Sequence, residues 1–168
     1  MIRYETGNDL DLDQVIELYR ASTLGERRPV DDRERMAAML RHANLVLTAW
    51  DGDLLVGISR ALSDFSFVTY LSDLAVRASH QKHGIGKELI RRTQAAATPA
   101  KLLLLAAPAA EKYYPRIGFA PARHWNLTGD YGDSDSFQFL PLTEAANALR
   151  GGHIHYAPEF GKVFSSIF

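Results

Sequence analysis

The stretch that decides the fold of this chain runs from residue 71 to residue 90 and reads LSDLAVRASHQKHGIGKELI. It predicts a strand that ends at Val76 and a helix that begins near Gly84, joined by a loop with glycines. Glycine lets a backbone approach a ligand closely, and a helix N-terminus offers unpaired N–H groups and partial positive charge to a phosphate. The same junction carries three basic side chains, Lys82, His83 and Lys87. It is therefore a candidate anion site.

Two familiar phosphate loops do not fit this junction. A P-loop would need a glycine at Gln81 and a serine or threonine at Glu88. A dinucleotide-binding fingerprint would need a third small residue at Leu89. An unrelated nucleotide-binding domain is therefore disfavoured, and the pattern Q-x-x-G-x-G after a strand remains.

The segments around the junction alternate between strand and helix patterns. Strands are predicted over residues 2–6, 45–50, 54–63, within 65–76, over 101–107, after Phe119 and over 137–142. Helices are predicted from Asp9 or Asp11 to about Ser22, from Asp31 or Asp32 to about His42, from Gly84 to Ala97, and over 109–117, with a loop over 25–30. This order predicts a mixed α/β layer fold in one domain over residues 1–168, with its core at 2–142. The segment 143–168 is predicted to be a helix followed by an aromatic-rich tail.

Composition excludes several classes of function. Lysine and arginine number 19 against 20 acidic residues, so no broad basic field exists to hold nucleic acid or anionic lipid. There is no cysteine, which excludes disulfides, thiolate metal sites and a cysteine nucleophile. His153 and His155 form an H-x-H pair without a third marked ligand, so no metal site is expected. The first twenty residues lack a signal core, and no apolar run approaches the roughly 20 residues that cross a bilayer. We therefore expect a cytoplasmic protein with neither a nucleic-acid nor a membrane partner.

Two blocks of sequence resemble one known family. LSDLAVRASHQKHGIGKELI is similar to the acyl-CoA-binding signature of the GNAT acetyltransferase superfamily, which is Q/R-x-x-G-x-G/A after a strand that ends in valine. YYPRIGF (113–119) resembles the second signature, an aromatic pair followed by a hydrophobic-Gly-Phe ending, and the apolar run 101–107 lies between the two blocks. The resemblance implies a GNAT-like acyl-CoA N-acyltransferase fold with a splayed central sheet flanked by helices. It also implies an acetyl-CoA-dependent N-acetyltransferase.

The resemblance also implies where acetyl-CoA binds. In this family, backbone amides of the glycine loop hold the CoA diphosphate; here the loop consists of Gln81, Lys82, His83, Gly84, Ile85, Gly86 and Lys87. The strand that ends in Leu74, Ala75 and Val76 pairs with the pantetheine arm, in the manner of a strand added to a sheet. A backbone N–H in this triplet would polarise the thioester carbonyl.

Three side chains are candidates for the chemistry. A primary alkyl amine such as lysine has a pKa of about 10.4, so a base must take a proton from it directly or through water. Asp73 is the first candidate base, at a position that is acidic in polyamine-type members; the alternative is a hydrogen-bonded structural carboxylate or an amine-attracting charge. Tyr70 is the second, at a position that is acidic in histone-type members. Tyr114 matches the tyrosine that donates a proton to the departing CoA thiolate in many members, with packing as its alternative, and Tyr113 is expected to pack.

The chain departs from the family pattern at two positions. Ala107 stands where many members carry an asparagine, and Pro115 follows Tyr114 where acidic residues are common, so the short helix can end or bend early. Ala107 gives some room to a non-catalytic acyl-CoA-binding or sensing module with the same fold. The retained Tyr114 argues against that interpretation.

The acceptor amine is not encoded in a readable motif. Its pocket would be built from the loop between the first helices, the turn 64–66 and the segment 124–136. The mixed-charge segment 25–28 (GERR) is predicted to be a solvated face, at a place where family members often close over the acceptor. The acceptor could be a polyamine, an amino acid, an aminoglycoside-like molecule or a peptide N-terminus. A homodimer is a further expectation, because the tail carries Tyr156, Phe160, Phe164 and Phe168.

Overall fold

The computed structural model describes residues 1–105, 113–130, 135–140, 148 and 150–154. The chain forms two compact units, Met1–Leu104 and Leu105–Phe168. The first unit contains the glycine junction, and the second contains the short elements that follow it. A single domain over residues 1–168 stays a prediction.

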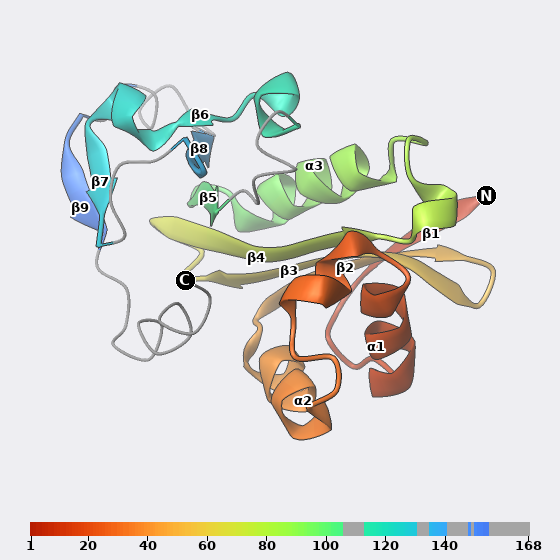
Figure 1. The fold of residues 1–168 in the computed structure, drawn as a ribbon. Coiled ribbons are helices and arrows are strands. Elements are labelled where there is room, and N and C mark those ends of the chain that lie inside the picture. The colour runs from red at the N-terminus through yellow and green to blue at the C-terminus, as the bar shows by residue number, and fades with distance from the viewer. Residues whose placement is uncertain (106–112, 131–134, 141–147, 149, 155–168) are drawn as a thin grey trace. The chain divides into compact units, whose positions relative to one another are not determined.

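Five strands lie side by side in the first unit in the order β1-β2-β3-β4-β5 (Figure 1). They are β1 (Ile2–Thr6), β2 (Leu45–Asp51), β3 (Leu54–Ser63), β4 (Val68–Val76) and β5 (Lys101–Leu105). β1 to β4 pair antiparallel in chain order, and β5 pairs parallel to β4. The predicted hairpin between β2 and β3 is confirmed, and Gly52 adopts the positive φ of 59° that such a tight turn requires.

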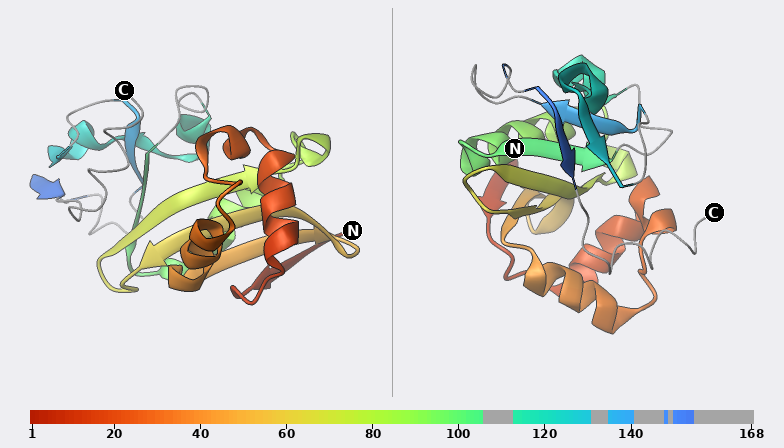
Figure 2. Two further views of the ribbon diagram at one scale, coloured as in Figure 1. Left: turned by 60° about the horizontal axis from the view of Figure 1, so that its bottom comes forward. Right: turned by 90° about the vertical axis from the view of Figure 1, so that its left-hand side faces the viewer.

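Three α-helices cover the two faces of this sheet. They are α1 (Leu12–Arg20), α2 (Arg33–His42) and α3 (Ile85–Ala97). Figures 1 and 2 show α1 and α2 on one face and α3 on the other. The α1 and α2 side has a continuous buried cluster that includes Val15, Tyr19, Met36, Leu55 and Ile58. The side chains of Asp11 and Asp32 cap α1 and α2 by accepting hydrogen bonds from first-turn amides, as predicted from their positions.

The prediction of a loop over 25–30 is wrong in its first part, because Thr23–Arg27 forms a 3-10 helix, η1. The hydroxyl of Ser22 accepts a hydrogen bond from the amide of Leu24, and the Leu24 side chain is buried. Gly25 is required here, since a Cβ on it would lie 2.5 Å from the carbonyl oxygen of Tyr19. A polar-looking segment is therefore folded tightly against the end of α1.

β4 changes its pairing in the middle of the strand. On the β3 side, Asp73 pairs with Arg60 and Leu71 pairs with Ala61, which leaves Ser72 as the extra residue of a β-bulge. On the β5 side, the pairing covers only Val68–Leu71 against Lys101–Leu104. Leu74, Ala75 and Val76 thus pair with β3 alone among the described residues.

The second unit consists of short elements. They are η4 (Tyr114–Ile117), β6 (Ala120–Pro121), η5 (Ala122–Trp125), β7 (Leu127–Gly129), β8 (Phe137–Leu140) and β9 (Gly152–Ile154). β6 pairs antiparallel with β8, and β7 pairs parallel with β9. Trp125 packs edge-on against Phe139 with ring centroids 4.8 Å apart.

The predictions for this half of the chain are only partly confirmed. The strands expected after Phe119 and over 137–142 appear as β6 and β8. The described part of the short helix expected over 109–117 is the 3-10 turn η4. In the predicted C-terminal helix and tail, residues 152–154 form a strand instead, because Gly151 and Gly152 adopt positive φ values that interrupt a helix. Residues 106–112, 141–147 and 155–168 lie outside the described residues.

Leu89 attaches α3 to the sheet, and its truncation tests how strongly. The Leu89 side chain is fully buried, and its Cδ1 would lie 3.0 Å from a Cβ placed on Gly57 of β3. Leu89→Ala should lower the free energy of unfolding by about 2–5 kcal/mol, measured by urea denaturation. Leu54→Ala, at an exposed leucine of β3, is the control and should stay within about 0.5 kcal/mol of the parent. A loss below about 1 kcal/mol for Leu89→Ala would show that α3 is attached by other contacts.

Candidate functional site

The candidate site begins at the edge of β4 that faces β5. Leu74, Ala75 and Val76 pair with Ser59, Ile58 and Gly57 of β3, whereas the ladder to β5 ends at Leu71. Backbone N–H and C=O groups that lie on a strand edge without a partner can pair with an extended ligand. The three residues predicted to line an acyl-CoA arm thus lie where the sheet opens.

The glycine loop, residues 81–87, connects this strand to α3. It follows a short 3-10 turn, η2 (Ala78–His80), and Gln81, Lys82, His83 and Gly84 are all exposed. Lys82 and Gly84 have positive φ values of 65° and 83°, which turn the backbone sharply. A Cβ on Gly84 would meet nothing within 4 Å, so the loop borders open space.

The N-terminus of α3 is open to an anion. Gly84 is the N-cap and has no side chain to bond to the first turn, in contrast to Asp11 and Asp32 at the N-termini of α1 and α2. The amide of Glu88 bonds to the carbonyl of Gly84, which begins the helical ladder. The amides of Ile85, Gly86 and Lys87 precede that ladder and are the donors that a helix start leaves for a ligand.

The loop is held in place by α1 and by the end of β4. The amide of Ala78 donates to the carbonyl of Ala21, 2.9 Å away. The side-chain amide of Gln81 donates to the carbonyl of Val76 at 3.0 Å, so this residue folds the loop back onto the strand. Arg77 forms an ion pair with Glu17 of α1. These contacts fix the loop before any ligand arrives, which lowers the cost of ordering it on binding.

Asp73 lies at the β4 bulge in a buried cluster of polar side chains. Its carboxylate oxygens accept hydrogen bonds from Nε of Arg60 at 2.5 Å, from Nε of Arg28 at 2.6 Å and from the Tyr19 hydroxyl at 2.9 Å. Arg60 also donates to Ser72 Oγ, and Arg28 donates to the Ser72 carbonyl. The exposed fraction of the side chain is 0% for Asp73, 7% for Arg60 and 24% for Arg28. We refer to Tyr19, Arg28, Arg60 and Asp73 as the bulge cluster.

This environment makes Asp73 a weak base. Burial alone would raise the pKa of Asp73, but the charges of Arg60 and Arg28 and their hydrogen bonds more than offset it, so the pKa lies below its usual range. Burial and the Asp73 charge raise the pKa of Tyr19. The geometry therefore supports the alternative that Asp73 is a hydrogen-bonded structural carboxylate.

Tyr70, the second candidate base, lies on β4 two residues before the bulge. Burial raises the pKa of Tyr70 to about 12, although the positive charge of Arg28 acts in the opposite direction. Its phenol is thus protonated at neutral pH. Tyr70 can donate a hydrogen bond there, but it would have to lose its proton first to act as a base.

Tyr114 belongs to the second unit, as the first residue of η4. Its ring packs edge-on against Tyr113 and Phe119, with centroid distances of 5.4 and 5.5 Å. Pro115 occupies the start of the turn, and Gly118 ends it with a positive φ of 99°. Both of these ring contacts of Tyr114, among the described residues, come from its own signature block.

The remaining sequence predictions concern the histidine pair His153 and His155 and the departure from the family pattern at Ala107. Nε2 of His153 contacts Asp130 at 2.7 Å, and Nδ1 contacts the hydroxyl of Thr128 at the same distance. His155, the predicted partner of His153, lies outside the described residues. Ala107, which stands where many family members carry an asparagine, also lies outside them. No group of three metal-ligating side chains occurs within the described part of the chain.

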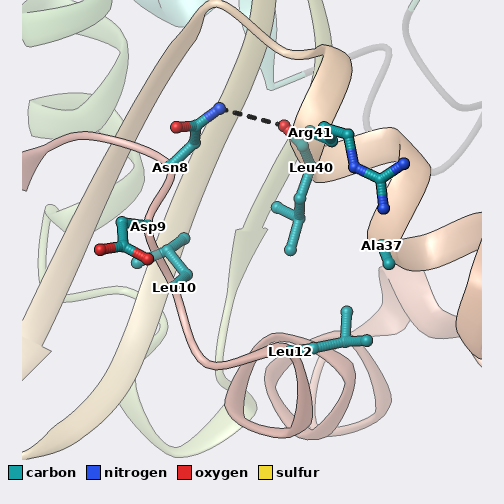
Figure 3. A pocket seen from close by; sticks show the side chains of 7 residues that line it. All are labelled: Asn8, Asp9, Leu10, Leu12, Ala37, Leu40 and Arg41. Carbon is teal, nitrogen blue, oxygen red and sulfur yellow. Dashed lines mark hydrogen bonds between the residues drawn. The ribbon is translucent and has the colours of Figure 1, made fainter.

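A separate hollow of about 380 Å³ lies beside α2 (Figure 3). It is lined by Asn8, Asp9, Leu10, Leu12, Ala37, Leu40 and Arg41. The Asn8 amide closes the C-terminal end of α2 by donating to the carbonyls of Leu40 and Ala43. None of its lining residues belongs to β4 or the glycine loop.

Sequence reasoning missed three members of the bulge cluster: Tyr19, Arg28 and Arg60. Tyr19 lies within the first predicted helix, for which no polar role was expected, and Arg28 was expected only as a solvated charge. The available signal was Arg60, a single charge within the otherwise apolar strand run LLVGISRALS. A charge at such a position is rarely buried unless it is paired.

A family model described as an acetyltransferase (GNAT) domain matches residues 21–124, which include both the glycine loop and Tyr114. The chain therefore belongs to the GNAT acetyltransferase family, as its two signature blocks indicated. A search among proteins with curated descriptions finds no match.

Solved structures show the same fold. A GNAT family acetyltransferase from Streptococcus pneumoniae is 26% identical, with a TM-score of 0.59 over 70% of this chain and 86% of that chain. A GNAT family N-acetyltransferase from Escherichia coli in complex with CoA is 21% identical, with a TM-score of 0.73 over 96% of this chain and 91% of that chain. An aminoglycoside 6'-N-acetyltransferase complexed with coenzyme A is 16% identical, with a TM-score of 0.59 over 82% and 93%. The predicted mixed α/β GNAT-like fold is thus confirmed.

Within the described residues, no helix combines the length and the apolar character needed to cross a membrane.

Asp73→Ala tests the structural role of the bulge cluster. Removal of the carboxylate leaves the buried Arg60 guanidinium without its counter-charge, so the free energy of unfolding should fall by roughly 3–5 kcal/mol. Because the folded-state pKa is depressed, the contribution of Asp73 should be present above its unfolded pKa of about 3.9 and lost as the pH falls through the folded-state value. Urea denaturation between pH 7 and pH 2 measures both effects.

Asp13→Ala is the matched control for this measurement. Asp13 pairs with Arg33 on the exposed side of α1, where an ion pair contributes about 0–1 kcal/mol. Equal losses for the two variants would contradict the structural role of Asp73.

Proposed function

We propose that this protein transfers the acetyl group of acetyl-CoA to a primary amine of a small molecule or peptide by direct attack. One observation carries the proposal: a strand edge that β5 leaves unpaired after Leu71, among the described residues, leads through a glycine loop into a helix N-terminus whose N-cap, Gly84, has no side chain. This combination provides a site for an extended arm and a site for a diphosphate in one continuous segment. The GNAT structure from Escherichia coli was solved with CoA, and membership of the family supports the same donor here.

The residues that would hold acetyl-CoA fit its chemistry. The backbone amides of residues 81–87 would bind the diphosphate, and Lys82, His83 and Lys87 add side chains that suit an anion. The edge of Leu74–Val76 would pair with the pantetheine amides. Acetyl-CoA supplies the activated thioester. A backbone N–H of this edge would stabilise the negative charge that develops on the carbonyl oxygen.

Direct transfer is favoured because the sequence has no cysteine to carry the acetyl group. The amine nitrogen forms a bond to the carbonyl carbon, the carbon–sulfur bond breaks, and the electron pair leaves on sulfur. Tyr114 would give its phenolic proton to that thiolate, as the family signature implies. The proton lost by the amine would leave through water, because Asp73 is enclosed by arginines and Tyr70 is already protonated.

The same observation gives a second candidate function some support. A non-catalytic acyl-CoA-binding or sensing module would need the donor site but no base. Calorimetry with acetyl-CoA, together with release of free thiol in the presence of a panel of amines, separates the two functions. Binding with amine-dependent thiol release supports the enzyme, and binding without thiol release supports the module. No heat with acetyl-CoA would contradict both. The cytoplasmic location and the homodimer stay predictions.

Gly84→Glu tests the diphosphate site. A carboxylate at this position would project into the open space beside the helix N-terminus, where its negative charge would repel a bound phosphate. The affinity for acetyl-CoA, measured by calorimetry, should fall at least about 100-fold.

Gly84→Ala is the control for that variant. It carries the same cost of a non-glycine residue at φ 83°, about 1–2 kcal/mol of folding stability, without the charge. Its affinity should stay within a few-fold of the parent, and equal losses for both variants would assign the effect to the backbone.

Tyr114→Phe tests the proposed proton donor. The variant should lower turnover about tenfold or more and leave the affinity for acetyl-CoA unchanged, because the lost hydroxyl acts only when the thiolate leaves. Tyr113→Phe, at the neighbouring and more exposed tyrosine, should retain full turnover. Unchanged turnover in Tyr114→Phe would remove this residue from the mechanism.

A further inference from the structure

The bulge cluster carries more positive than negative charge. Arg28 and Arg60 share the single carboxylate of Asp73, and Tyr19 is a neutral donor to it. One positive charge therefore remains unbalanced within the cluster.

The charged groups nearest in the chain do not remove this surplus. Glu26 and Arg27, the exposed residues just before Arg28, carry opposite charges. Asp31 forms an ion pair with Arg20, 2.7 Å apart. The surplus of the cluster thus persists.

Arg28 is the residue at which a ligand can reach the surplus charge of the cluster. Asp73 and Arg60 are enclosed, whereas the Arg28 side chain is 24% exposed. A guanidinium has five N–H donors, and the bonds of Arg28 within the described residues go to Asp73, to the Ser72 carbonyl and to the Arg27 carbonyl. Two N–H donors are left for a ligand. A guanidinium with donors to spare binds a carboxylate with specific geometry, and better than it binds a neutral group.

Arg28 also lies at the right place along β4. Arg28 donates a hydrogen bond to the carbonyl of Ser72, which is two residues from Leu74. At Leu74 the ladder to β5 has ended, and the acetyl group is proposed to lie beside the edge that begins there. Two residues of a strand span about 7 Å. A dipeptide covers a similar distance, since an extended chain spans at most about 3.6 Å per residue. An acceptor of this size could place its amine at the thioester and its carboxylate at Arg28.

We propose that Arg28 determines the acceptor class of this site, and that the acceptor is the α-amine of a short peptide whose free carboxylate lies about the length of a dipeptide away. The proposal rests on the proposed function of the same site. Arg28 binds the acceptor carboxylate, and the surplus charge disfavours polyamines and aminoglycosides, which would bring several like charges to it.

Matched acceptors test the proposal on the unmodified protein. Dipeptides with a free C-terminal carboxylate are compared with the same dipeptides amidated at that end, so that the reacting α-amine is nearly unchanged. The free carboxylate should raise kcat/KM for thiol release by about tenfold or more, the effect of one charge-assisted hydrogen bond. Spermidine and kanamycin should be poorer acceptors than either dipeptide. Equal rates for the dipeptide pair, or preference for the polycations, would overturn the proposal.

Variants at Arg28 assign the effect to this side chain. In Arg28→Gln the preference for the carboxylate should fall to about twofold or less, while the affinity for acetyl-CoA stays that of the parent. Arg28→Lys keeps the charge but loses the fork of donors, and should retain part of the preference. Arg3→Gln removes one exposed positive charge from β1 and is the control, with an unchanged preference. An unchanged preference in Arg28→Gln would contradict the assignment.

Two further measurements keep the outcomes distinct. Thermal unfolding followed by circular dichroism shows whether Arg28→Gln is folded; if it is not, Arg28→Lys and the dipeptide pair on the parent protein decide the question. Calorimetry of each dipeptide in the presence of CoA measures acceptor binding without turnover. Failure to bind acetyl-CoA would contradict the proposed function, whereas acetyl-CoA binding with no preference between the dipeptides would contradict only the role of Arg28.

Discussion

The structure of the first unit depends on one buried carboxylate, that of Asp73. Burial of a charge costs several kcal/mol unless it is paired and hydrogen-bonded, and Asp73 meets this condition by accepting bonds from Tyr19, Arg28 and Arg60. These partners come from α1, from the segment after η1 and from β3. A single interaction network therefore fixes a helix, a connecting segment and two strands at one point of β4.

At that point the pairing of β4 with its neighbouring strands changes. Ser72 is the extra residue of the bulge, and both arginines bond to it, one at the carbonyl and one at the hydroxyl. The ladder between β4 and β5 ends at Leu71, immediately before this residue, and the strand continues towards the glycine loop. The bulge cluster thus holds β4 at the point beyond which it is no longer paired with β5. On the opposite face of the sheet, α3 packs through Leu89 and presents its N-terminus at the end of the same strand.

The parts of this arrangement that are local in sequence could be predicted. The Asp-Gly turn, the caps at Asp11 and Asp32 and the glycine loop each depend on a few neighbouring residues, and each was found where the pattern placed it. The bulge cluster depends on contacts between distant residues, such as Arg28 with Asp73, 45 positions apart. From the sequence alone, the segment GERR does not show whether Arg28 is solvated or contacts a buried carboxylate. Only the pairing register, which sets Arg60 opposite Asp73, shows that the two lone charges of adjacent strands belong together.

The enclosure of Asp73 also bears on how the amine loses its proton. A carboxylate that accepts hydrogen bonds from two arginines attracts a proton only weakly, and a net positive charge nearby disfavours an ammonium relative to the free amine. Such a site suits amines that are already easy to deprotonate. An α-amino group has a pKa of about 7.7–8.0, against about 10.4 for a lysine side chain, a difference of roughly 3 kcal/mol at neutral pH. The charge surplus that favours a carboxylate at Arg28 therefore also favours the α-amine at the other end of a short peptide.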